Sequence, residues 1–291
     1  IENEVVKANL AVLEQTRDVV DVGLRDLEEI TQQIRQNRDL AKLKYTDEPY
    51  AADRVMWVIH TVRNLYAYGL GNPMILDYFV LFPRSNLVVG AGKAFSLEYF
   101  YGHVLPIRGM SLAEFTETFV AAPAGPSFLP RHTVTVDDSA RPVVVYLGSL
   151  EAVDSTNALV IVLIDQHYLT QALDRIGLSH GGGAIIHDGS SIVATVGADY
   201  EHVLSGVVEE GPVVRKERIG SQEMVITSVP STYNSWRFTA VQPTSFVLEP
   251  VIRFRAIAFA ILFCGLLVDL SLSLFLARRS TRPVLSVLEV I

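Results

Sequence analysis

The sequence predicts an α+β protein with a long amino-terminal helix, two small modules built on antiparallel sheets, and one closing transmembrane helix. Three observations lead to this fold class. The first segment has helical periodicity and no proline, the middle of the chain runs twice through the same order of strands and helices, and residues 256–277 are almost entirely apolar.

Residues 1–47 are expected to form the long helix, since they contain no proline and Gly23 is their only glycine. Apolar residues recur at alternating spacings of three and four, a seven-residue repeat that predicts one apolar stripe. This stripe consists of Leu10, Leu13, Val20, Leu24, Leu27 and Ile34. Two interpretations stay open: the stripe packs on the chain's own sheets, or it pairs with a second copy in a homodimer.

Residues 48–178 are expected to form the first module, which would lie farther from the membrane. A second helix is predicted over 51–68, and "ILDYFVLFPRSNLVVGAG" reads as two strands joined by a turn. Two short helices follow, the second opened by the capping pattern Ser111 to Glu114. "HTVTVDDSARPVVVYLGSL" and "NALVIVLID" supply three more strands before the helix "QHYLTQALDRI".

Residues 179–250 repeat this order in a shorter form and are expected to be the membrane-proximal module. "GGGAIIHDGSSIVATVG" predicts a strand pair around an Asp188-Gly189 turn. "VVRKERIGSQEMVITSVP" and "WRFTAVQP" predict three more strands, with Gly220 at a hairpin. The boundary between modules is expected near 181–183. The architecture is therefore predicted to be an internal duplication, without detectable repetition of residues.

Residues 256–277 are predicted to span a membrane. A helix of this length rises about 33 Å against roughly 30 Å of bilayer hydrocarbon, and Asp269 is its only charge. Subtracting the five arginines and two acidic residues that follow Val251 from the chain's 24 basic and 32 acidic residues leaves 19 and 30, a net charge of −11. We expect residues 1–251 to be extracytoplasmic and residues 278–291 to be a cytoplasmic juxtamembrane segment at the cell membrane.

The two ends of the chain suggest a piece of a longer receptor. The sequence begins with Ile1 inside a helical pattern, which is typical of a fragment trimmed just after an upstream span. Beyond the predicted span, Val284, Leu288 and Ile291 would share one helical stripe, as at the start of a parallel dimeric connector. An anchor without a signalling partner would not need such a stripe.

Catalytic and metal sites are not expected. The only cysteine, Cys264, lies inside the predicted span, and the seven histidines show no His-x-x-x-His spacing. "SHGGGAIIHDG" leads into a strand pair and lacks the Lys-Ser/Thr of a phosphate loop. We therefore predict no enzyme activity, no cofactor and no metal. The acidic composition also argues against contact with nucleic acid by this part of the protein.

The segments "DYFVLFPRSNLVVGAG", "ALVIVLIDQHYLTQAL", "GAIIHDGSSIVATVG" and "WRFTAVQPTSFVLEPV" resemble the extracytoplasmic double Cache (tandem PAS-like) sensor domains of bacterial receptors. Among receptors, the chain looks most like the membrane-bound AraC-type transcription regulators of Gram-positive bacteria. That resemblance implies a cytoplasmic helix-turn-helix domain beyond this chain, which would bind DNA. Alternatives are the sensor portion of a histidine kinase or chemotaxis receptor, and a membrane-tethered structural or interaction domain without a ligand.

The resemblance also implies a ligand cavity in the membrane-distal module, between its sheet and the helices after the first hairpin. The residues to which it points are Tyr99, Tyr101, His103, Arg131, Tyr146 and Asp165. Aromatic and hydrogen-bonding side chains suit a small polar ligand, and their abundance favours a sugar or oligosaccharide. Amino-acid-binding members carry an Arg, Trp and Tyr pattern that lacks its Trp here. Each of these tyrosines could instead be a half-buried core residue.

Overall fold

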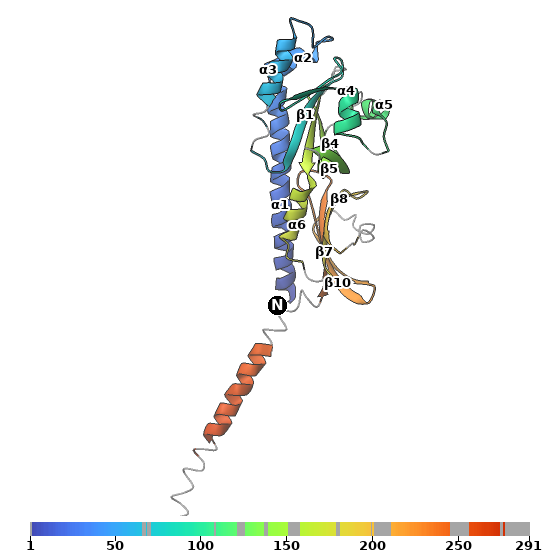
Figure 1. Cartoon of the computed structure of the whole chain (residues 1–291). Coiled ribbons are helices and arrows are strands. Elements are labelled where there is room, and N and C mark those ends of the chain that lie inside the picture. The colour runs from blue at the N-terminus through green and yellow to red at the C-terminus, as the bar shows by residue number, and fades with distance from the viewer. Residues whose placement is uncertain are drawn as a thin grey trace, which may run out of the picture.

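The computed structural model contains one long helix, two sheets beside it and a separate apolar helix (Figure 1). Each sheet is antiparallel throughout, as the sequence predicted. The structure describes the following residues: 2–65, 68, 71–107, 109–120, 126–136, 139–150, 158–178, 181–198, 200, 211–244, 256–273 and 276.

The amino-terminal segment forms two helices where the sequence predicted one. Helix α1 spans Glu2–Arg35, and α2 spans Arg38–Lys44. The interruption lies at Asn37, which has an extended backbone and whose side-chain oxygen caps α2 by accepting the backbone N–H groups of Asp39 and Leu40. Asparagine competes with helical hydrogen bonding in this way, and the periodicity of the apolar residues does not reveal it.

The apolar stripe of α1 packs on the chain's own sheets. Leu13, Val20, Leu24, Leu27 and Ile34 are all completely buried inside one chain. Of the two interpretations that the sequence left open, packing within the chain is therefore confirmed for the stripe. A second copy would have to pair with α1 through its other face.

The distal sheet has the strand order β3-β2-β1-β6-β5-β4. Its central strands are buried on both faces, because helices cover each side. The strands of this sheet are β1 (Ile75–Phe82), β2 (Leu87–Gly90), β3 (Lys93–Ser96), β4 (Ser127–Val136), β5 (Ser139–Ser149) and β6 (Leu159–Asp165).

The proximal sheet has the order β8-β7-β11-β10-β9. If the extra edge strand β3 is left out, the distal order β2-β1-β6-β5-β4 corresponds strand by strand to this proximal order. In both sheets the first hairpin lies at one edge, and the three strands that follow in the sequence are arranged with the last of them next to the hairpin. The predicted internal duplication is therefore present in the topology. Its strands are β7 (Gly183–His187), β8 (Ile192–Gly197), β9 (Val213–Ile219), β10 (Gln222–Pro230) and β11 (Arg237–Pro243).

Two groups of helices cover opposite faces of the distal sheet, because successive residues of a strand point to opposite sides. Tyr78 and Val80 belong to the buried cluster that contains α1, whereas Phe79 and Leu81 belong to the cluster of the short helices. The helices on the side of α1 include α3 (Val55–Leu65). On the other side lie α4 (Leu97–Tyr99), the π-helix η1 (Phe100–Val104), α5 (Leu112–Phe115) and the π-helix η2 (Thr116–Val120).

Local signals of the sequence explain the ends of these elements. The capping box of Ser111 and Glu114 is present at the start of α5, with both reciprocal hydrogen bonds. Gly189 and Gly220 adopt positive φ values of 92° and 62° in the β7–β8 and β9–β10 turns, where glycine avoids the strain of a side chain. These three predictions are confirmed.

The two modules share one hydrophobic core along α1. Helix α6 (Gln166–Asp174) follows β6 and contacts β5, β7, β8 and α1. The Gln166 side-chain amide donates to the Val193 carbonyl of β8 at 3.2 Å, across the boundary between modules. The same buried cluster contains residues of both sheets and of α1, so the two modules pack against one helix through a continuous core.

The helix Ala256–Ser273 is the one candidate membrane span among the described residues. Its mean hydropathy is 2.2, and none of its residues is buried inside the protein. A core helix of a soluble domain would instead bury most of its apolar side chains. Length, composition and lack of burial thus agree with the span that the sequence predicted.

Candidate functional site

The face of the distal sheet that the short helices cover is packed with apolar side chains. Phe79, Phe100 and Phe115 are completely buried there, and the Phe79 and Phe100 rings meet edge to face at 4.8 Å. Aromatic pairs of this geometry add stability beyond the area that they bury. Around this cluster lie Tyr99, Tyr101 and His103, three of the six residues that the resemblance implied.

Tyr99 and His103 form an exposed aromatic stack at the edge of this face. The Tyr99 ring lies 4.4 Å from the His103 ring, nearly parallel to it, and 5.7 Å from the ring of Phe95. Tyr99 is 52% exposed although Phe95 and His103 are both stacked neighbours of its ring, so the stack is partly open to solvent. The stack arises because positions 99 and 103 are four apart on one helical surface, where side chains meet.

Tyr101 is turned into the short-helix layer. Its hydroxyl donates to the Met110 carbonyl at 2.7 Å, and its ring packs against Phe115 at 5.4 Å. Burial, together with the negative charge of Glu114, raises the pKa of the Tyr101 hydroxyl. Tyr101 therefore ties η1 to the segment before α5, and its hydroxyl stays protonated.

Arg131 lies on β4, the strand that contacts η1. The β4–β5 register shifts between Leu129 and His132, and Arg131 there adopts a positive φ of 57°, a value uncommon for a residue with a side chain. A bulge of this kind redirects a side chain at the rim of a sheet. Arg131 is exposed, beside the layer that carries Tyr99 and Tyr101.

Tyr146 and Asp165 lie elsewhere. Tyr146 is 2% exposed and points to the α1 side of the distal sheet, where its ring packs against Phe128 at 5.3 Å. Asp165 caps α6 by accepting the His167 backbone N–H at 2.9 Å. The structure thus brings Tyr99, Tyr101 and His103 together beside the strand of Arg131, and separates them from Tyr146 by the sheet itself.

Asp21 is a polar contact that the sequence analysis did not single out. Its carboxylate is completely buried on α1 and accepts three hydrogen bonds from the loop between β10 and β11. The donors are the Ser231 hydroxyl at 2.6 Å, and the Thr232 backbone N–H and hydroxyl at 2.7 and 2.8 Å. An aspartate beside the apolar stripe of a helix looks solvent-exposed in sequence, so no local signal marks it.

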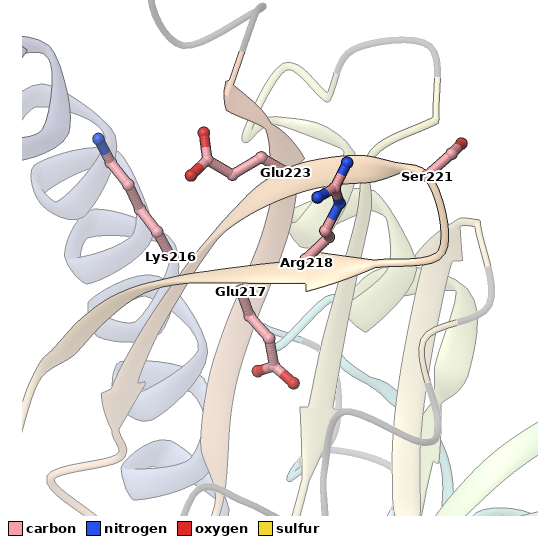
Figure 2. Close-up of a pocket in the computed structure, with 5 residues that line it drawn as sticks. All are labelled: Lys216, Glu217, Arg218, Ser221 and Glu223. Carbon is pink, nitrogen blue, oxygen red and sulfur yellow. The ribbon is translucent and has the colours of Figure 1, made fainter.

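A depression of about 420 Å³ lies on the β9–β10 hairpin of the proximal module. Figure 2 shows Lys216 and Arg218 on one side of β9, with Glu217 pointing to the other side. Ser221 and Glu223 complete the lining. The lining charges have both signs and belong to one solvent-exposed hairpin, so they do not converge on one ligand chemistry.

In the described part of the chain, no group of three or more histidine, cysteine or acidic side chains could hold a metal ion. The free Cys264 lies exposed on the apolar helix.

Solved structures share this fold. The ligand-binding domain of the Campylobacter jejuni chemoreceptor Tlp3, in complex with 4-methylisoleucine, matches with a TM-score of 0.52 and 10% identity, over 86% of this chain and 95% of that one. The ligand-binding domain of Mlp24 with asparagine has a TM-score of 0.52 and 11% identity, over 86% and 96%. The extracellular domain of rpHK1S-Z16, assigned as a histidine kinase, has a TM-score of 0.50 and 13% identity, over 85% and 95%.

Sequence comparison alone does not reach these structures. No family model matches the chain, and no curated protein is similar enough to stand as a relative. At 10–13% identity the likeness concerns the fold, which is that of double Cache extracellular domains. Of the three named structures, one comes from a chemoreceptor and one from an assigned histidine kinase, and none of them lends support to an AraC-type output.

Proposed function

We propose that this chain is the extracytoplasmic, ligand-sensing portion of a membrane-bound signalling receptor. The observation that carries the proposal is a two-module fold, shared with sensory domains over most of its length, in a chain that also has a candidate membrane span. A membrane-tethered structural domain would not require two modules that pack against one helix through a shared hydrophobic core. The chain is proposed to be a binding protein and not an enzyme.

The output domain of this receptor is proposed to be of the chemotaxis or histidine-kinase type. The similarity in fold to the matched structures supports these alternatives better than the AraC-type regulator that the sequence resemblance suggested. The predicted connector stripe of Val284, Leu288 and Ile291 lies outside the described residues. The sequence beyond residue 291 would decide between a kinase core, a methylated hairpin and a helix-turn-helix pair.

The ligand site is proposed to lie in the distal module, at the layer that holds Tyr99, Tyr101 and His103, with Arg131 at its rim. The open aromatic stack supports this choice, because flat aromatic faces pack against small rigid molecules. Tyr146 and Asp165, also among the expected residues, have structural tasks as a core side chain and a helix cap. We expect them to act on the site only indirectly.

Two classes of ligand are candidates for the proposed distal site. Exposed stacked aromatic rings favour a sugar or oligosaccharide. The matched domains of Tlp3 and Mlp24 carry an isoleucine derivative and asparagine, which supports amino acids as the second class. Both are small polar molecules, and Arg131 could pair with a carboxylate of the second class.

A thermal-shift screen of the full chain in maltoside micelles against sugars, oligosaccharides, amino acids and organic acids tests the proposal. A true ligand at a hundred times its dissociation constant stabilises the fold by about 2.7 kcal/mol. Tyr99→Ala should weaken its binding about tenfold or more through loss of the stacking surface. Val214→Ala removes an exposed apolar side chain from β9 of the proximal sheet and serves as the control. Unchanged affinity in Tyr99→Ala would refute the location.

Signal transmission is proposed to run along α1. This helix is hydrogen-bonded to both modules. Arg35 donates to the Ser149 carbonyl of the distal module at 3.0 Å, and Asp21 accepts from the Ser231 hydroxyl of the proximal module. A ligand can bias two arrangements only by its difference in affinity for them, typically about 1 to 3 kcal/mol. The expected continuation through residues 245–250 lies outside the described residues.

A homodimer remains a proposal for the intact receptor. The outer face of α1 carries exposed apolar residues at Val12, Val19 and Val22, and the first two are seven apart. Pairing of two copies through this face would leave the buried stripe undisturbed. It would also bring together the helices that are proposed to move.

A further inference from the structure

A cavity of about 390 Å³ lies where α1 and the two modules meet. It is distinct from the proposed distal ligand site, because it lies on the opposite side of the distal sheet, next to Tyr146. The residues used in the argument below are Glu28, Phe128, Asp188, Tyr233, Asn234 and Trp236. They come from α1, from β4 of the distal module, and from the β7–β8 turn and the β10–β11 loop of the proximal module. The helix and both modules therefore build one cavity.

Aromatic rings form one wall of this cavity. Phe128 of the distal module and Trp236 of the proximal module meet edge to face, with ring centroids 4.9 Å apart. Trp236 is only 1% exposed and thus rigidly held. The loop that carries Tyr233 and Trp236 is anchored to α1 by the buried carboxylate of Asp21, which orders this wall before any ligand arrives.

Negative charge lies beside this wall. Glu28 projects from α1 next to the Tyr233 hydroxyl, and Asp188 lies in the adjacent turn. Asp188 accepts hydrogen bonds from Ser190 and Ser191, backbone and side chain, which favour its ionised form. Of the described residues that line the cavity, none is basic. The two carboxylates are therefore not neutralised within the lining.

Two residues of the lining, Tyr233 and Asn234, each have a buried polar side-chain atom without a hydrogen-bond partner in the described protein. The Asn234 side-chain oxygen accepts the Trp236 backbone N–H at 2.9 Å, while its amide nitrogen is buried and has no hydrogen-bond partner in the described protein. A buried donor without a partner costs about 1 to 3 kcal/mol, which a ligand oxygen would recover. The cavity thus combines aromatic rings, carboxylates and two buried donor groups in one lining.

We propose that this cavity is a second ligand site, which binds a small organic cation with an oxygen acceptor close to its charge. Aromatic faces and carboxylates both attract an ammonium group, and the amide of Asn234 would take the acceptor. Because such a ligand touches α1 and both modules, its binding favours the arrangement in which they are closed together. It would therefore adjust the response to the ligand of the distal module, a function beyond the sensing proposed above.

Choline is a suitable probe, and 3,3-dimethylbutan-1-ol is its uncharged counterpart of nearly the same shape. The full chain carrying Trp57→Phe, in dodecyl maltoside micelles, leaves Trp236 as the only tryptophan and hence the reporter of the cavity. We expect choline to change its fluorescence saturably, and the uncharged alcohol to bind about tenfold or more weakly, since cation–π attraction is lost.

Two matched substitutions on one helix complete the test. Glu28→Gln removes the carboxylate at the cavity and should weaken choline binding about tenfold. Glu29→Gln removes an exposed carboxylate that does not line the cavity and should leave the affinity unchanged. The proposal is overturned by any of three results: no saturable signal with choline, equal binding of the uncharged alcohol, or an equal effect of both substitutions.

Discussion

His187 shows how burial sets the chemistry of a single side chain in the proximal module. Its ring is completely buried on β7. Nδ1 accepts the Gly189 backbone N–H at 3.2 Å, so the proton of the neutral ring lies on Nε2, which donates to the Thr239 hydroxyl at 3.2 Å. Burial, assisted by the positive charge of Arg237, lowers the pKa of His187 to about 4.

This pKa makes stability depend on pH with a definite sign. The unfolded chain binds a proton at His187 near pH 6.5 and the folded chain only near pH 4, so acid favours unfolding between these values. We expect a loss of about 2 kcal/mol in the free energy of unfolding from about pH 7 to about pH 5. Urea unfolding of the full chain in micelles at both pH values measures it.

Substitution separates His187 from the other titrating groups. His187→Gln should lower stability at neutral pH but lose this part of the pH dependence. His167→Gln, which changes an exposed histidine of α6, should keep it. A pH slope in His187→Gln equal to that of the unaltered chain would show that this histidine does not carry the effect.

At the scale of elements, α1 is the part that joins the modules. The Asp21 contact with the β10–β11 loop holds it to the proximal sheet, and Asn9 adds a weaker bond to Gln242 at 3.5 Å. Charge-assisted hydrogen bonds are about twice as strong as neutral ones, and Asp21 makes three from a buried position. The helix is thus held to the proximal sheet most strongly at Asp21, while its apolar stripe packs along the shared core.

Asp21→Asn should destabilise the chain by about 2 to 3 kcal/mol, because an amide cannot accept all three hydrogen bonds and leaves donors unsatisfied. Thermal unfolding measures the change. Asp26→Asn, on the exposed side of the same helix, should cost about 0.5 kcal/mol or less. Comparable losses for both substitutions would contradict the importance of the contact. The β10–β11 loop, which Asp21 holds, also lines the cavity where α1 and the two modules meet. Asp21→Asn should therefore also weaken choline binding in that cavity.

At the scale of the whole molecule, the acidic double module and the apolar helix imply one orientation. We expect residues 1–251 outside and the arginine-containing tail inside the cell. A cysteine introduced at the exposed Ser190, in a chain with Cys264→Ser, should react in intact cells with a maleimide that cannot cross membranes. A cysteine introduced at Ser280 should react only after the membrane is opened. The reverse pattern would refute this orientation.

The sequence by itself determined most of the elements and their order, but not the break between α1 and α2 or the edge strand β3. Periodicities of about 3.6 and 2 residues located the helices and strands, glycine located turns, and the long apolar run located the candidate span. These signals are local, because each depends on residues a few positions apart. Even the buried stripe of α1 was visible, although its partner in the same chain was not.

Only the tertiary structure decided which side chains meet. Tyr101 and Tyr146 looked like members of one site, but Tyr101 belongs to η1, which covers one face of the distal sheet, whereas Tyr146 points from β5 to the other face. Asp21 and Thr232 are far apart in sequence and gave no local signal, yet they form the buried contact between helix and loop. The cavity between Phe128 and Trp236 exists only because two modules pack against one helix, and such packing depends on distant residues that no short window of sequence contains.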